Sequence, residues 1–277
     1  MDADKNIELH IPSVMGYEKI AMECAASMAK KMGFTDNRIE DLKTAVAEAC
    51  LNAIEHGNKM DTSTKVGITL TVEEARLQVS VKDRGKGIDK ISVPSIQNKI
   101  EGKDQPRGWG IFLIKSLVNE VTFEQGPEGG NVTKMVIYLE KWFVGKIQWP
   151  KEDIPVSPGA QNVMNKDIQV SISNKDDVSI LNIKGDVTAI TGETIEEAYR
   201  KVSTAGTKKI LLYFDKDGYI NSGGIAILIG IASESRKKEQ KIRITGLSSH
   251  FQKIFDMVGL TKYTEIFPSE ELALKDF

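Results

Sequence analysis

The sequence is poor in the residues that form disulfides and zinc sites. Its 277 residues include two cysteines, Cys24 and Cys50, and both lie in apolar stretches with a helical pattern. We expect them to be buried thiols in a reducing compartment rather than a disulfide or a redox pair. The three histidines do not cluster with these cysteines at the spacing of metal ligands, so no zinc site is expected.

The sequence also lacks a strong charge of one sign and a long hydrophobic run. Its formal net charge is -2, which indicates neither a general nucleic-acid surface nor an acidic tail. The N-terminus is polar and charged, without a signal-peptide pattern, and no apolar run approaches the length of a membrane span. We therefore expect a cytoplasmic protein that contacts neither nucleic acid nor membrane directly.

The length suits two domains of ordinary size, and the sequence pattern changes between the two halves. We predict a first domain over residues 1–145, a linker with proline and glycine over 146–166, and a second domain over 167–277. In the first domain, periodicity predicts strand 7–11, helices 17–32 and 36–55 with Asp36 as N-cap of the latter, hairpin strands 65–72 and 76–82, helix 111–119, and strands 121–125 and 131–139. In the second it predicts strands 168–173, 178–185, 209–214 and 241–245 and helices 191–204, 223–238 and 250–258, an alternation typical of a sheet covered by helices.

Three short blocks in the first domain carry its candidate chemistry. They are, in order, Glu48 with Asn52, Asp83-x-Gly85-x-Gly87, and Arg107-Gly108-x-Gly110. A carboxylate one helical turn before a carboxamide can hold a hydroxyl and a Mg²⁺ ion side by side. An aspartate after a strand can accept a hydrogen bond from the amine of adenine, and glycines that open a helix present free N–H groups to phosphate. Each block alone is also common in ordinary helices and turns, so the evidence lies in their joint order.

Through these blocks the sequence resembles the GHKL (Bergerat-fold) ATP-binding family over about residues 5–140. Within that family it fits best the short anti-sigma-factor serine kinases of bacterial partner switching. The resemblance implies that the first domain binds ATP and Mg²⁺, with Glu48 as general base and Asn52 as metal ligand. It further implies a set of nucleotide contacts: Asp83, Gly85 and Gly87 at adenine, residues 91–105 as the ATP lid, and Arg107, Gly108 and Gly110 at phosphate.

In the second domain Ser222 follows a strand and a loop and opens an apolar helix. A role as helix N-cap accounts for this serine adequately; alternatively its hydroxyl can carry a phosphate, whose charge the helix dipole tolerates. Residues 167–274 resemble the STAS domains of anti-sigma-factor antagonists, in which an Asp-Ser-Ser-Gly-type turn carries the serine that a cognate kinase phosphorylates. Ser222 matches that serine, whereas Asn221 and Gly223 depart from the pattern.

The two resemblances imply an α/β architecture: a GHKL α/β sandwich with a mixed sheet and helices on one face, followed by a smaller STAS-type domain of sheet plus helices. They imply a protein serine kinase fused to its own type of substrate, with the acceptor being Ser222 of the same chain, Ser222 of a second copy, or a separate STAS protein. They also imply a sigma factor or another regulator as partner, and a homodimer formed through the first domain.

Two other functions remain open. The protein could be a nucleotide-gated binding switch that captures a sigma factor or another regulator without significant kinase activity. It could also be an interaction protein with vestigial pockets. Replacement of Glu48 by alanine separates the kinase from the binding switch, because it should abolish signalling by a kinase and matter little to a switch. Failure to bind an ATP analogue would favour the interaction protein with vestigial pockets.

Overall fold

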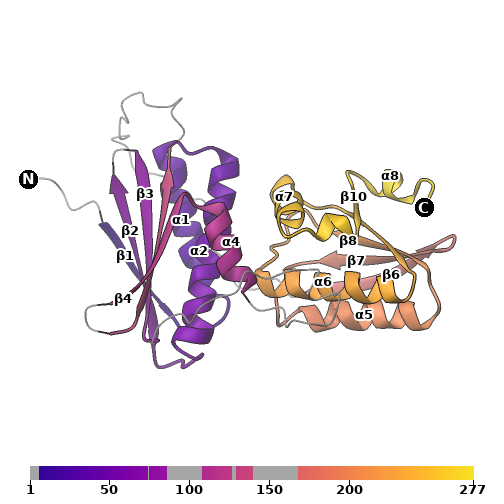
Figure 1. Cartoon of the computed structure of the whole chain (residues 1–277), viewed down its shortest axis with the longest axis horizontal. Helices are drawn as coiled ribbons and strands as arrows, with labels where there is room; N and C mark the ends of the chain where they lie inside the picture. Colours follow the sequence, from indigo (N-terminus) through magenta and orange to yellow (C-terminus); the bar gives the residue numbers. More distant parts are fainter. Residues whose placement is uncertain (1–5, 74, 86–107, 127–128, 140–167) are drawn as a thin grey trace, which may run out of the picture. The chain divides into compact units, whose positions relative to one another are not determined.

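The computed structural model describes residues 6–73, 75–85, 108–126, 129–139 and 168–277, and the chain forms two compact units (Figure 1). The predicted linker at 146–166 lies outside the described residues, as do Gly87, Arg107 and the predicted ATP lid at 91–105. None of the helices in the described segments combines the length and the apolar character that crossing a bilayer requires.

The first unit contains a five-stranded sheet. Its strands are β1 (Asn6–Pro12), β2 (Lys65–Glu73), β3 (Arg76–Asp83), β4 (Glu120–Gln125) and β5 (Asn131–Tyr138), in the order β1-β2-β3-β5-β4. Each of these pairings is antiparallel. The predicted fold class is confirmed, but a mixed sheet was wrong for the described part of this unit. The strands β3 and β4 run in the same direction, but β5 lies between them and pairs antiparallel with both.

Three helices cover one face of this sheet (Figure 1). They are α1 (Glu18–Met32), α2 (Asp36–Asn52) and α4 (Trp109–Leu117). Alternate strand residues such as Ile68, Leu70 and Val79 point to these helices and are buried, as the period of two predicts. Cys50 is buried and Cys24 partly exposed, and both thiols are free. Burial raises the pKa of each thiol, which makes both poor nucleophiles.

The α2 helix differs from the prediction at both ends. Thr35, which has an extended backbone, is its N-cap, and Asp36 is the first helical residue. At the other end the helix continues beyond Asn52 as a π-helical turn, Ala53–Gly57. The Asn58 N–H closes that turn by donating to the Ala53 carbonyl at 2.7 Å. Such π turns within α-helices are frequent at functional sites.

The second unit contains a mixed five-stranded sheet between two helical layers. Its strands are β6 (Gln169–Lys175), β7 (Val178–Lys184), β8 (Lys209–Phe214), β9 (Lys241–Thr245) and β10 (Glu265–Phe267), in the order β10-β9-β8-β7-β6. The β6–β7 pair is antiparallel and the other pairs are parallel. The helices are α5 (Gly192–Thr204), α6 (Ser222–Lys237), α7 (Ser249–Met257) and α8 (Glu270–Leu274); α5 and α6 lie on one face of the sheet and α8 on the other (Figure 1).

The last two short elements, β10 and α8, escaped prediction because three and five residues are too few to show a period. Arg243 holds them in place. Its guanidinium lies between the rings of Phe267 and Phe277, at 4.7 and 4.4 Å from their centroids. It also donates hydrogen bonds to the carbonyls of Ala273 and Lys275. Arg243 is therefore a packing residue of the C-terminal segment.

Candidate nucleotide-binding site and phosphoacceptor loop

Glu48 and Asn52 lie one turn apart near the C-terminal end of α2. The spacing places them on the same side of the helix. Glu48 is almost completely buried, with 1% of its surface exposed, whereas Asn52 is partly exposed. Asn52 is also the last α-helical residue before the π turn. Glu48 is therefore recessed within the first unit, whereas Asn52 is partly accessible at its surface.

Asp83, at the end of β3, is held by its neighbours. Its Oδ1 accepts hydrogen bonds from the Gly85 N–H at 2.6 Å and from Asn131 Nδ2 at 2.9 Å. The side chain is 9% exposed. Burial raises the pKa of this carboxyl and outweighs the hydrogen bonds from Gly85 and Asn131, which lower it. Asp83 is thus a preorganised acceptor in a weakly solvated position.

The end of the π turn contacts this carboxyl group directly. A Cβ atom added to Gly57 would lie 2.2 Å from Asp83 Cγ, and one added to Gly85 would lie 3.0 Å from the Gly57 Cα atom. Glycine is therefore required at both positions because the backbones approach too closely for a side chain. This contact brings the helix that carries Glu48 and Asn52 to Asp83, so the structure joins two of the three predicted blocks.

Asn58 and Asn131 complete the same cluster. The Asn58 carboxamide accepts from the Arg84 N–H at 2.8 Å and donates to Ser13 Oγ at 2.8 Å, which ties the helix end to the loops after β3 and β1. Sequence reasoning missed Gly57 and Asn131 as members of the site. Asn131 lies opposite Asp83 in the pairing of β3 with β5. The sequence does not reveal this register, so it gave no signal for Asn131.

The third predicted block lies at the start of α4. Gly108 has a left-handed backbone with φ of 94°, which favours glycine, and the helix begins at the next residue. Gly110 is buried in the first turn. A helix N-terminus offers unpaired N–H groups and the positive end of the dipole. Gly108 and Gly110 therefore lie at the N-terminus of α4, as the predicted block requires, while Arg107 and Gly87 belong to the undescribed part of the chain.

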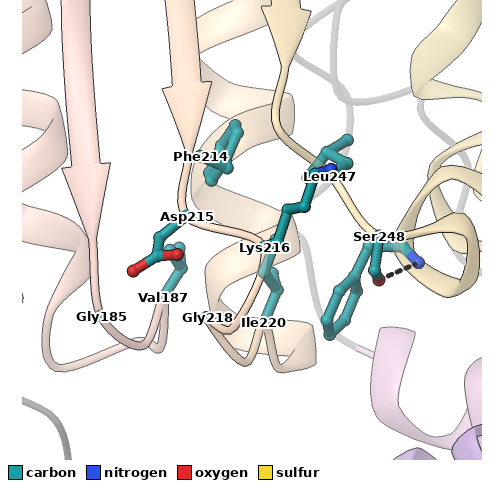
Figure 2. A pocket seen from close by; sticks show the side chains of 10 residues that line it. Gly185, Val187, Phe214, Asp215, Lys216, Gly218, Ile220, Leu247 and Ser248 are labelled. Atoms are coloured by element: carbon teal, nitrogen blue, oxygen red, sulfur yellow. Dashed lines mark hydrogen bonds between the residues drawn. The ribbon is translucent and has the colours of Figure 1, made fainter. Parts of the chain in front are cut away.

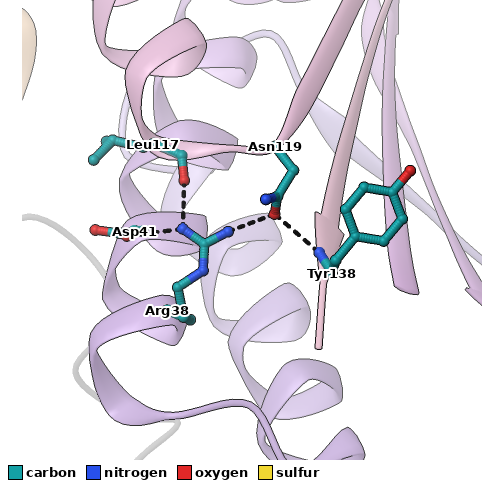
Figure 3. Close-up of polar contacts among 5 residues, drawn as sticks. All are labelled: Arg38, Asp41, Leu117, Asn119 and Tyr138. Carbon is teal, nitrogen blue, oxygen red and sulfur yellow. Dashed lines mark hydrogen bonds and ion pairs between the residues drawn. The ribbon is translucent and has the colours of Figure 1, made fainter. Parts of the chain in front are cut away.

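Arg38 fixes the other end of α4 (Figure 3). Arg38 lies in the first turn of α2. One of its guanidinium nitrogens donates to the Leu117 carbonyl at 3.0 Å and pairs with Asp41 at 3.1 Å. The other nitrogen donates to Asn119 Oδ1 at 2.6 Å, and Asn119 also accepts from the Tyr138 N–H at 3.0 Å. One side chain therefore links α2, the C-terminal end of α4 and β5. This network sets the position of the helix whose N-terminus carries the glycine turn.

Ser222 lies at the N-terminus of α6, after the loop that follows β8. The N-cap is Asn221, not Ser222, because the Asn221 side chain accepts from the Gly224 N–H at 3.0 Å. Ser222 is the first helical residue and is partly exposed. The N-cap interpretation of Ser222 was therefore wrong. The error arose because either residue of an Asn-Ser pair is a favoured cap.

A narrow crevice lies at the carboxyl ends of β7, β8 and β9 (Figure 2). It spans about 230 Å³ including space open to solvent, and its walls include Val187, Phe214, Ile220, Leu247 and Phe251. The Ser248 hydroxyl at its edge accepts from the Phe251 N–H at 3.3 Å and so caps α7. Its lining residues come from the end of β8, the loops after the three strands and the first turn of α7, so the crevice lies within the second unit.

Comparison with known proteins matches each unit to a family. Residues 13–137 match the histidine kinase-like ATPase domain, and residues 169–273 match the STAS domain. The serine-protein kinase RsbW of Bacillus subtilis is 33% identical over 138 residues, which cover 48% of this chain and 85% of that protein. The chain belongs to the RsbW serine-protein kinase family. The RsbW of Bacillus thuringiensis is 29% identical over 147 residues, 51% of this chain and 89% of that protein.

The RsbW relatives match about half of this chain, and the STAS domain occupies much of the remainder. The predicted combination of a GHKL-type ATPase domain with a STAS domain is thereby confirmed. Among solved structures, the RsbU and RsbW domains of a Mycobacterium tuberculosis protein give a TM-score of 0.36 at 19% identity, covering 48% of this chain and 32% of that chain. An anti-sigma factor antagonist from Mycobacterium paratuberculosis gives a TM-score of 0.35 at 18% identity, covering 39% and 91%. Likeness at this level supports no conclusion about activity.

Proposed function

We propose that this protein is an ATP- and Mg²⁺-dependent protein serine kinase of a bacterial partner-switching system, with a STAS serine as its acceptor. The observation that carries the proposal is the contact of Gly57 with Asp83, which brings the Glu48–Asn52 helix to a buried, hydrogen-bonded carboxylate. The match to serine-protein kinases named RsbW supports the same reaction class. Ser222 is the proposed acceptor in this chain.

The residues of the first unit suit a nucleotide. The Gly85 N–H and Asn131 Nδ2 both donate to Asp83 Oδ1, and we assign this held carboxylate to the exocyclic amine of adenine. Gly85 leaves no side chain beside that carboxyl group, which suits a flat base. Gly108 and Gly110 are assigned to phosphate at the N-terminus of α4, together with Arg107; Gly87 is assigned to the adenine end. Asn52 supplies an amide oxygen for Mg²⁺, a hard cation that prefers oxygen ligands and shares them with substrate phosphates.

Phosphoryl transfer then needs an oriented serine hydroxyl. Ser222 Oγ attacks the γ-phosphorus in line, the new O–P bond forms as the bond to the β-phosphate oxygen breaks, and ADP leaves. Glu48 orients the hydroxyl and accepts its proton. Asn52 would hold Mg²⁺, which when bound would supply positive charge to the phosphate oxygens. The acceptor is Ser222 of the same chain, Ser222 of a second copy, or the matching serine of a separate STAS protein.

The proposed partners follow from the family. They are STAS proteins and a sigma factor or another regulator, in the cytoplasm, with a homodimer formed through the first unit. A covalent connection between kinase and acceptor raises their effective concentration to roughly millimolar when the linker can span the distance. Weak recognition is then sufficient for transfer within one chain.

Intact-mass measurement after incubation with Mg-ATP tests the proposal. We expect the wild-type chain to gain one phosphate, Ser222→Ala to gain none, and Glu48→Ala to gain none while it still binds an ATP analogue. Wild-type protein that keeps its mass and transfers no phosphate to an added STAS protein would refute the kinase assignment.

A nucleotide-gated binding switch is the second candidate function. The observation that favours it is the 1% exposure of Glu48, because a base this deeply buried reaches a substrate hydroxyl only if the site opens. Under that alternative Glu48→Ala leaves partner capture and its nucleotide dependence unchanged. The two functions are therefore separated by one variant measured in two assays, phosphate transfer and partner binding.

A further inference from the structure

The segment that leads into α5, residues 187–192, presents an exposed apolar side chain. Ile190 is 63% exposed, more than any other large hydrophobic residue in the part of the chain that the structure describes. Ala189 beside it is also exposed. A single exposed isoleucine needs no explanation by itself. Its significance depends on how firmly the loop is held and on what lies next to it.

Hydrogen bonds within the loop hold Ile190 outward. The Thr188 N–H donates to Thr191 Oγ1 at 2.8 Å, and Thr191 Oγ1 donates to the Asp186 carbonyl at 2.7 Å. The Gly192 N–H closes the turn on the Thr188 carbonyl at 2.9 Å. These hydrogen bonds hold the backbone on both sides of Ile190 while its side chain is exposed. The exposure of Ile190 is therefore built into the loop.

The same loop lies against the turn that carries Ser222. A Cβ atom added to Gly223 would lie 2.7 Å from Ala189 Cβ, and one added to Gly224 would lie 2.2 Å from the Val187 carbonyl oxygen. The N-terminus of α6 therefore packs on residues 187–189 without intervening side chains. Ile190 follows directly and so belongs to the surface around the phosphoacceptor.

We propose that Ile190 is a specificity-determining residue through which a histidine kinase-like ATPase domain recognises the Ser222 turn. This inference rests on the proposed function. Glu48 is almost completely buried, so a serine reaches it only by entering an opened site, which brings the surface around that serine against the ATPase domain. The apolar side chain of Ile190 loses its water on contact, and burial of one such side chain favours binding. The occupant of this surface is the ATPase domain itself, in the same chain or in a second copy.

The test is the initial rate at which the full-length chain gains phosphate at Ser222 from Mg-ATP. We expect Ile190→Ala to lower this rate about tenfold, the effect of about 1.4 kcal/mol of lost contact, and Ile190→Asp to lower it further. Ile190→Val should stay within about twofold of the wild type, because most of the apolar contact remains. Affinity for an ATP analogue and melting temperature should not change, since Ile190 packs little in the free protein.

Leu272→Ala is the matched control. Leu272 is also exposed, at 47%, but it lies on α8, on the other face of the second sheet from α6. Its replacement should leave the rate within about twofold of the wild type. Equal rates for Ile190→Ala and Leu272→Ala, with a phosphorylated wild type, would overturn the role of Ile190 and leave the kinase assignment intact. A wild type that gains no phosphate at Ser222 overturns the role of Ile190, and it overturns the kinase assignment as well if an added STAS protein also gains no phosphate.

Discussion

Replacement of Gly57 by alanine is the sharpest test of the proposed adenine site. The new Cβ would lie 2.2 Å from Asp83 Cγ, so the carboxyl group must move by about 1.2 Å to reach ordinary contact at 3.4 Å. Overpacking of this kind costs roughly 1–3 kcal/mol. The shift also weakens the two hydrogen bonds that Asp83 Oδ1 accepts, at 2.6 and 2.9 Å, each of which contributes about 0.5–1.5 kcal/mol. We therefore expect a loss of about 2–4 kcal/mol in the stability of the first unit.

Gly57→Ala should also lower the affinity for nucleotide, in addition to its effect on stability. A displaced Asp83 loses its hydrogen bond to adenine, and a bond to a charged acceptor is worth about 1.5–3 kcal/mol, or roughly a 10- to 100-fold loss of affinity. Calorimetric titration with an ATP analogue and thermal unfolding measure the two effects. Gly67→Ala is the control, because its new Cβ would lie 3.6 Å from the His10 ring, an ordinary contact. Wild-type affinity in a folded Gly57→Ala protein would refute the assignment of adenine to Asp83.

Two further predictions concern the same unit. Arg38→Met should destabilise it by roughly 2–4 kcal/mol in chemical denaturation, because Asp41, 2% exposed, loses the paired guanidinium. Lys43→Met is the control and should cost less than about 1 kcal/mol, because it breaks ion pairs with Glu23 and Glu40 at the surface of α1 and α2. Equal losses of stability in the two variants would contradict this prediction. Because burial raises the pKa of Asp83, and adenine requires the ionised form, ATP affinity should fall as the pH drops through that raised pKa, at a higher pH than for an ordinary aspartate. The pH dependence of stability runs the other way: the contribution of Asp83 to stability is greatest below the usual aspartate pKa and declines as the pH rises through the raised pKa. Titrations with an ATP analogue across pH should show the fall in affinity for the wild type and not for Asp83→Asn.

The order of helices and strands could be predicted because each long element carries its own period. In the strands β2 and β3, buried residues alternate with residues that are mostly partly exposed, and the sequence shows that alternation directly. The all-antiparallel pairing of the described strands in the first sheet could not be predicted in the same way. It depends on β5 entering between β3 and β4, a long-range pairing that no local pattern encodes.

The candidate site was predictable as three blocks and not as a constructed cluster. Glu48, Asn52 and Asp83 are chemically distinctive, so their types and order are visible in the sequence. Gly57 and Asn131 act only through proximity to Asp83. A glycine that stops a helix and a glycine that admits a carboxylate have the same local signature, and only the fold distinguishes them.

The departure of Asn221-Ser222-Gly223 from the family's turn has a steric component that leads to a final prediction. A side chain at position 223 would place its Cβ 2.7 Å from Ala189 Cβ and 2.8 Å from the Ala189 nitrogen, so Gly223→Ser must displace residues 187–189 or the N-terminus of α6. We expect a cost of about 1–3 kcal/mol in the unfolding free energy of the second unit. Asn221→Asp should cost little, because a carboxylate can accept the same hydrogen bond from the Gly224 N–H. If Gly223→Ser is as stable as Asn221→Asp in denaturant titrations, the close approach of the 187–192 loop to Ser222 is wrong, and the role of Ile190 loses its structural basis.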